Sequence, residues 1–149
     1  MAIADELRRM RKASGLTQAQ LAKLAGTSQP RLASYESGAA QPSPAMVTRI
    51  TDAAKPLPRF ALYQHRDEVN RLAERFGLKN VRVFGSVARS TDTRQSDIDL
   101  VVTRQDGVSV FKMAAFAALV EDLVGYPVDV VSDNGRTDDD RVLVEALAL

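Results

Sequence analysis

Acidic residues inside short strand-like runs constrain the fold of this chain more than any other feature. The run 81–84 is β-branched and aromatic and ends at Gly85-Ser86, which predicts a strand that enters a turn. Ten residues further on, Asp97 and Asp99 flank one apolar residue at the start of a second apolar run. Because residues two apart on a strand point to the same side, the two carboxylates are expected to share one face of a sheet.

This pair of carboxylates, taken with its neighbours, predicts a particular chemistry. Two carboxylates held so close repel each other, and a divalent cation such as Mg²⁺, which prefers hard oxygen ligands, relieves the repulsion. A third acid, Asp129, lies in the apolar run PVDVVS. Gly85 lets a backbone approach a phosphate closely, and the Ser86 hydroxyl can hold phosphate oxygens. The set indicates phosphoryl or nucleotidyl transfer, whereas an isolated pair of acids would fit the solvated face of a strand.

The full pattern resembles the minimal nucleotidyltransferases (MNT proteins) of the polymerase-beta type. Their signature is Gly-Ser, ten residues, then Asp-x-Asp, with a third acid on a later strand, and the resemblance spans roughly residues 66–149. It implies an α/β (α+β) domain with a small mixed sheet flanked by helices and a final apolar helix in RVLVEALAL. It also implies ATP or another NTP as the donor substrate, with one or two Mg²⁺ ions.

The resemblance gives each matching residue a role. The catalytic and metal-binding residues would be Asp97, Asp99 and Asp129. The nucleotide-phosphate-binding residues would be Gly85, Ser86 and Arg89. Asp129 would also help to deprotonate the attacking hydroxyl, and Arg89 would neutralise charge that develops on the phosphates.

Four short helices are predicted before residue 55. Thr17 begins one with a capping-box sequence, Ser28 can cap the next, and Ser43 precedes a proline that opens the fourth. Glycines separate the first three helices. Two short helices joined by a tight glycine-containing turn in a basic bundle are typical of a helix-turn-helix.

The string LTQAQLAKLAGTSQPRLASYESG resembles the helix-turn-helix of phage repressors and Xre-like regulators, over about residues 4–54. In that family the third helix enters the major groove. The residues that would contact DNA are Gln18, Ser28, Gln29, Arg31 and Ser34. Gln18 would hold a phosphate, Gln29 could read adenine and Arg31 guanine. The resemblance also implies a structural ion pair between Arg11 and Glu36. A small bundle that contacts only protein is the alternative.

The charge distribution and the prolines divide the chain. Residues 1–60 hold nine Lys or Arg against four Asp or Glu, whereas residues 61–149 hold eleven against fifteen. A basic first part suits a polyanion and an acidic second part suits a cation. We therefore expect an all-α DNA-binding domain over 1–54, a proline-rich linker over 55–60 and the nucleotidyltransferase domain over 61–149. An amphipathic helix over 61–76 would open that domain.

Targeting signals and cysteines are absent from the sequence. No apolar run approaches membrane-spanning length, and the charged, amphipathic beginning is not expected to act as a signal peptide. The lack of cysteine excludes disulfides and Cys-ligated zinc, and it fits a reducing cytoplasm. A cytoplasmic protein without a membrane partner is the expectation.

The combined resemblances predict an antitoxin. MNT proteins of this kind usually work beside a helical HEPN-type toxin and can transfer AMP from ATP to a tyrosine of it, and antitoxins often bind their own operator DNA. A homo- or hetero-oligomer is expected, because a single helix-turn-helix contacts one half-site. Two alternatives remain open: a non-catalytic regulator that neutralises by binding, and nucleotide transfer to a small molecule.

Overall fold

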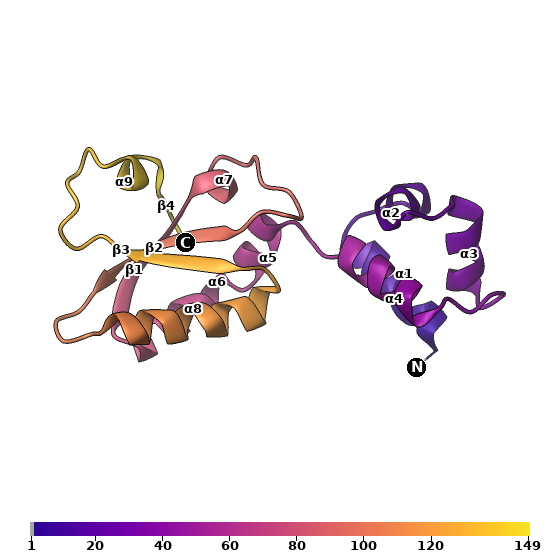
Figure 1. Ribbon diagram of the computed structural model, residues 1–149, viewed down its shortest axis with the longest axis horizontal. Coiled ribbons are helices and arrows are strands. Elements are labelled where there is room, and N and C mark those ends of the chain that lie inside the picture. Colours follow the sequence, from indigo (N-terminus) through magenta and orange to yellow (C-terminus); the bar gives the residue numbers. More distant parts are fainter. Residues whose placement is uncertain (1) are drawn as a thin grey trace. The chain divides into compact units, whose positions relative to one another are not determined.

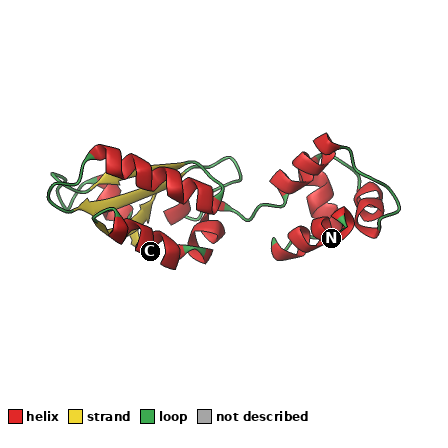
Figure 2. Cartoon of the chain, turned by 90° about the horizontal axis from the view of Figure 1, so that it is seen from below, coloured by secondary structure: helices red, strands yellow, loops and turns green. Residues whose placement is uncertain are grey.

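The computed structural model describes residues 2–149 and divides into two compact units, the first ending at Pro56 and the second spanning Leu57–Leu149. Among the described residues, strands occur only in the second unit, and the first consists of helices and loops (Figure 2). The predicted combination of an all-α unit and an α/β unit is therefore confirmed.

Within residues 2–56 the first unit holds four helices, and the last three begin where the sequence predicts caps. Their bounds are α1 Ile3–Ala13, α2 Gln18–Ala25, α3 Gln29–Ser37 and α4 Pro44–Ala53. Thr17 forms a capping box with Gln20, and the side chains of Ser28 and Ser43 accept a backbone N–H in the first turns of α3 and α4. The core is formed by apolar side chains that include the fully buried Leu7, Leu21, Leu32 and Ile50.

The predicted ion pair of this unit is present and joins α1 to α3. The Arg11 guanidinium donates to both carboxylate oxygens of Glu36, with Nε–Oε2 and Nη2–Oε1 distances of 2.9 Å. The same guanidinium donates to the Leu16 carbonyl at 2.9 Å. Because Glu36 is buried, the pair belongs to the scaffold of the unit and is not available to DNA.

The second unit begins with α5 Pro58–Gln64 and α6 Arg66–Arg75, and continues with β1 Leu78–Phe84, α7 Gly85–Ala88, β2 Ile98–Arg104, α8 Val110–Val124, β3 Val128–Ser132, α9 Arg141–Glu145 and β4 Leu147–Ala148. Its sheet has the order β3-β2-β1-β4. β2 and β3 run parallel, while β1 is antiparallel to both β2 and β4, so the sheet is mixed, as the sequence predicts. No helix in residues 2–149 has the length and apolar character needed to cross a bilayer.

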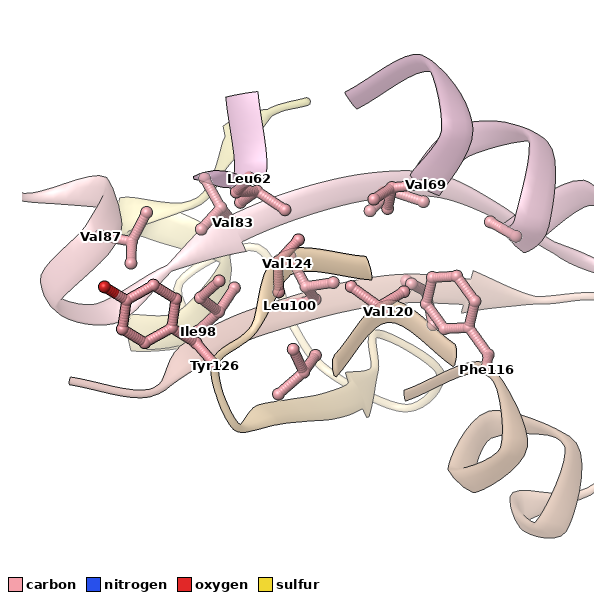
Figure 3. Close-up of a cluster of buried hydrophobic side chains, with 14 of the residues drawn as sticks. Leu62, Val69, Val83, Val87, Ile98, Leu100, Phe116, Val120, Val124 and Tyr126 are labelled. Carbon is pink, nitrogen blue, oxygen red and sulfur yellow. The ribbon is translucent and has the colours of Figure 1, made fainter. Parts of the chain in front are cut away.

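Helices lie on both sides of this sheet. α6 and α8 cover one face, and α7 and α9 lie over the other (Figure 1). The alternation along β2 turns Ile98, Leu100 and Val102 into the core beneath α6 and α8. Figure 3 shows this core, in which Leu100 lies near Val120 and Val124 of α8, and Val69 of α6 and Phe116 of α8 lie farther along the strands. The acidic side chain of Asp99, which alternates with these residues along β2, lies on the opposite face, beside α7 and α9.

Two predictions about helices are wrong. The helix expected over 61–76 is two helices, α5 and α6, separated at His65. The break lets each short helix turn its own apolar residues into one core, Leu62 from α5 and Val69 from α6. The helix expected in RVLVEALAL ends at Glu145, and the next residues form β4, which pairs with Arg82 and Val83 of β1. Pairing with the edge of the sheet outweighs the helical propensity of Ala and Leu.

Candidate nucleotidyltransferase site

Strand register places two of the predicted acids side by side. Asp99 of β2 is the direct neighbour of Asp129 of β3 in the parallel pair, so both side chains lie on one face of the sheet. On its other side, Asp99 is registered with Phe84, the last residue of β1. The third acid, Asp97, directly precedes β2 and is exposed. The sequence predicts a strand that begins at Asp97, whereas β2 begins one residue later, so only Asp99 of this pair lies on the strand.

Burial and neighbouring carboxylates both affect the pKa of Asp99. Partial burial raises the pKa of its carboxyl above the usual value, and the nearby carboxylates of Asp129 and Asp97 raise it further. The Arg89 guanidinium opposes this rise in pKa, and the Glu145 carboxylate adds to it. Within residues 2–149, no hydrogen bond to the Asp99 carboxylate contributes to lowering this pKa.

The Gly-Ser turn lies directly against the Asp99 carboxylate. Gly85 has φ +72°, in the left-handed region. A Cβ atom built on Gly85 would collide with the carboxylate of Asp99, so a side chain here would displace that carboxylate. Glycine is therefore required both by the backbone conformation and by the close approach of Asp99. The sequence predicts a turn after β1, and the structure forms a one-turn helix, α7, there.

The predicted phosphate-binding residues gather around the same turn. Ser86 is half-buried in α7. Arg89, directly after α7, forms an ion pair with Glu145 of α9, with Nη1 2.9 Å from Oε2. Glu145 Oε1 also accepts a hydrogen bond from the Gly85 backbone N–H at 2.7 Å. Sequence analysis missed Glu145, because no local pattern connects it to a turn 60 residues earlier.

Asp92 is a second residue that sequence analysis missed. It is buried in the loop between α7 and β2, where its carboxylate accepts the Arg59 backbone N–H at 3.0 Å and lies 3.3 Å from Arg59 Nη1. Arg59 also donates to the Ser90 carbonyl at 2.9 Å. These contacts tie the loop between the Gly-Ser turn and Asp97 to the start of α5.

The three acids fit a hard cation by their chemistry. Asp99 and Asp129 place carboxylates at paired positions of β2 and β3, and Asp97 directly precedes β2, so all three offer the hard oxygen ligands that Mg²⁺ prefers. In the described part of the chain, however, no three acidic, His or Cys side chains are arranged so that they could hold a metal ion as they stand. The metal-ligand set of Asp97, Asp99 and Asp129 therefore stays a prediction.

In the first unit, the predicted DNA-contacting residues lie at the start of α2 and along α3. Ser28, Gln29 and Arg31 are exposed, and Gln18 and Ser34 are half-exposed. Two internal contacts orient the long side chains: Gln29 Nε2 donates to Gln18 Oε1 at 2.9 Å, and Arg31 Nε donates to the Tyr35 hydroxyl at 2.9 Å. These residues form one polar surface, and their contact with DNA stays a prediction.

Comparison with known proteins agrees with the two-unit reading. Residues 2–55 match the model of a helix-turn-helix domain, and residues 62–144 match that of a nucleotidyltransferase domain. The chain belongs to the nucleotidyltransferase domain family and carries a helix-turn-helix domain before it. Its enzyme class is accordingly nucleotidyltransferase.

The relatives include named adenylyltransferases. The protein adenylyltransferase MntA of Thermococcus cleftensis is 36% identical over 70 residues, covering 47% of this chain and 68% of MntA. The candidate protein adenylyltransferase MJ0126 of Methanocaldococcus jannaschii is 32% identical over 73 residues, covering 49% of this chain and 71% of that protein. A solved structure of a candidate minimal nucleotidyltransferase superposes with a TM-score of 0.55 and 38% identity, over 61% of this chain and 95% of that one.

The charge of Asp99 is expected to destabilise the metal-free fold. Because the pKa of Asp99 is raised by burial and by its acidic neighbours, the folded state disfavours the ionised form at neutral pH. Asp99→Asn should therefore raise the melting temperature of the second unit in EDTA at pH 7 by roughly 2–5 °C. The gain should shrink as the pH falls through the raised folded-state pKa of Asp99 and vanish below the ordinary carboxyl pKa, because Asp99 is then protonated in both folded and unfolded states. An equal gain at every pH would contradict this account.

Proposed function

We propose that this protein is an antitoxin that transfers a nucleotide, AMP from ATP, to a hydroxyl of a partner protein, an HEPN-type toxin, in a Mg²⁺-dependent reaction. Its helix-turn-helix unit binds operator DNA and represses the genes of the pair. The observation that carries this proposal is the contact between Gly85 and the Asp99 carboxylate. This contact places a phosphate-binding turn beside paired acids, and nucleotidyl transfer requires both features.

The names of the relatives support a protein acceptor. Two of them, which this chain covers by 68% and 71% of their length, are named as protein adenylyltransferases. The same names favour ATP over the other nucleotides. A small-molecule acceptor is therefore the weaker alternative.

Residues of this chain can be assigned a role in each step of the transfer. Gly85, Ser86 and Arg89 bind and orient the phosphates of ATP, and Arg89 offsets their charge. The acceptor oxygen attacks the α-phosphorus, the bond from that phosphorus to the bridging oxygen breaks, and pyrophosphate leaves. The proton of the acceptor hydroxyl passes to Asp129. Mg²⁺, held by Asp97, Asp99 and Asp129, would screen the phosphate charge and lower the pKa of the attacking hydroxyl.

A mass-shift assay tests the transfer. The purified protein is incubated with Mg²⁺, each NTP in turn and the toxin encoded by the neighbouring gene, and intact masses are recorded. One or more AMP units on the toxin, with ATP as the best donor, are expected. No shift with any nucleotide, together with a stable complex of the two proteins, would refute the transfer and support a regulator that acts by binding.

DNA binding is tested by a charge-matched pair of substitutions. Arg31→Ala should weaken binding to the protein's own promoter DNA by about 10–100-fold, because a guanine-reading arginine contributes about 1–3 kcal/mol. Lys12→Ala removes the same charge from an exposed position of α1 and should weaken binding much less. Affinity is measured by fluorescence anisotropy at one fixed salt concentration. Equal losses would show that Arg31 contributes only general charge.

A further inference from the structure

The Glu145 carboxylate occupies the donors of the Gly-Ser turn. Oε1 accepts the Gly85 N–H at 2.7 Å and lies 3.2 Å from Arg89 Nη1, while Oε2 lies 2.9 Å from the same nitrogen. Two of the three proposed phosphate-binding residues therefore already hold an anion, and this anion belongs to the chain itself. Glu145 is the acid in ion-pair contact with Arg89, whose charge also acts on Asp99.

A carboxylate and a phosphate would bind the same hydrogen-bond donors of this turn. Both present anionic oxygens to a backbone N–H and a guanidinium. The Gly85 hydrogen bond, followed by the Arg89 contacts, lowers the pKa of Glu145, so the side chain is held as the anion at neutral pH. One N–H cannot serve both anions at full strength, and the Glu145 charge also lies close enough to raise the pKa of Asp99. A triphosphate that enters meets occupied donors and additional negative charge.

The surrounding structure holds Glu145 at this position. It is the last residue of α9, and the following strand β4 pairs with Arg82 and Val83 of β1. Leu149 N–H then donates to the Val81 carbonyl at 3.1 Å. Figure 1 shows α9 and α7 on the same side of the sheet. With the backbone anchored in this way, the carboxylate can leave the turn by side-chain rotation, while β4 stays paired.

We propose that Glu145 is a displaceable intramolecular occupant of the nucleotide-phosphate position, which competes with the triphosphate of ATP and keeps nucleotide affinity low. Arg89 exchanges one anion for the other when the nucleotide enters. This inference rests on the proposed function, because it takes Gly85 and Arg89 to be ligands of the phosphates. It extends that function by adding a regulatory contact inside the site.

The test measures nucleotide binding without transfer. The dissociation constant of a non-hydrolysable ATP analogue with Mg²⁺ is determined by calorimetry for the full chain and its variants. Glu145→Ala, which removes the competing anion, should tighten binding at least about fivefold, equivalent to about 1 kcal/mol. Glu145→Gln keeps an acceptor oxygen without the charge and should give a smaller gain. Glu74→Gln removes an exposed charge from α6 and should leave the constant unchanged.

A second measurement reports on the turn directly. Inorganic triphosphate is titrated into ¹⁵N-labelled protein, and the Gly85 amide resonance is followed. The Glu145→Ala variant should reach saturation at a concentration at least fivefold lower than the wild type. This readout needs neither the acceptor protein nor turnover, and it also shows whether the variant remains folded.

The outcomes separate this inference from the function on which it rests. If Arg89→Ala weakens binding of the analogue while Glu145→Ala leaves it unchanged or weakens it, Glu145 does not compete and the inference is wrong, although the site assignment stands. If neither the wild type nor Glu145→Ala binds any nucleotide, both the inference and the proposed function are wrong. Tighter binding by Glu145→Ala, together with weaker binding by Arg89→Ala, supports both.

Discussion

Replacing Asp97 and Asp99 together by Asn is expected to reduce nucleotide transfer at least about 1000-fold, because it removes two of the three carboxylates on which the proposed metal depends. Asn is nearly isosteric with Asp, Asp97 is exposed and Asp99 is only partly buried, so the fold should be retained. DNA binding should be unchanged, since the helix-turn-helix unit has a hydrophobic core of its own. Transfer is measured as AMP incorporation into the toxin, and DNA binding by anisotropy.

A charge-matched control separates the site from its surroundings. Asp138 and Asp139 are adjacent, exposed acids in the loop before α9. Their double replacement by Asn removes the same two charges and should change transfer less than about threefold, the scale expected for exposed charges. Continued labelling of the toxin by the Asp97/Asp99 variant would show that the acids of another site perform the reaction.

Local spacing made the acids and the turn predictable. Gly85, Asp97 and Asp99 lie within 15 residues of one another, and alternation along a strand fixes which side chains share a face. Asp129 was predictable because the side chain of a lone acid in an apolar strand lies either on a solvated face of the sheet or in a functional site. In the structure, Asp99 and Asp129 occupy directly paired positions of β2 and β3.

The residues that hold the turn were not predictable in this way. Asp92 bonds to Arg59, 33 residues away, and Glu145 bonds to Gly85, 60 residues away. Neither contact has a local signature, because each depends on how distant segments return to the sheet. Glu145 was further obscured because RVLVEALAL has the composition of a helix, while its last residues instead pair with β1.

The helix caps of the first unit show the opposite case. Thr17, Ser28 and Ser43 each satisfy a backbone N–H within three residues, so their effect is encoded locally and appears where it was expected. The break at His65 was missed, since the apolar spacing across it is compatible with one helix. Packing of two short helices against the same core decided the outcome there.

Gly85→Ala is expected to lose at least about 100-fold in transfer and to lower the melting temperature of the second unit by about 10 °C. A left-handed φ costs an alanine about 1–2 kcal/mol, and the new Cβ must also push away the Asp99 carboxylate, for a total near 2 kcal/mol. Gly107→Ala is the matched control, because Gly107 has φ +82° and open space around the same position. It should show only the conformational cost, with transfer intact. If both variants lost transfer and stability equally, backbone strain alone would explain the requirement for glycine, and the contact between the turn and Asp99 would have no part in transfer.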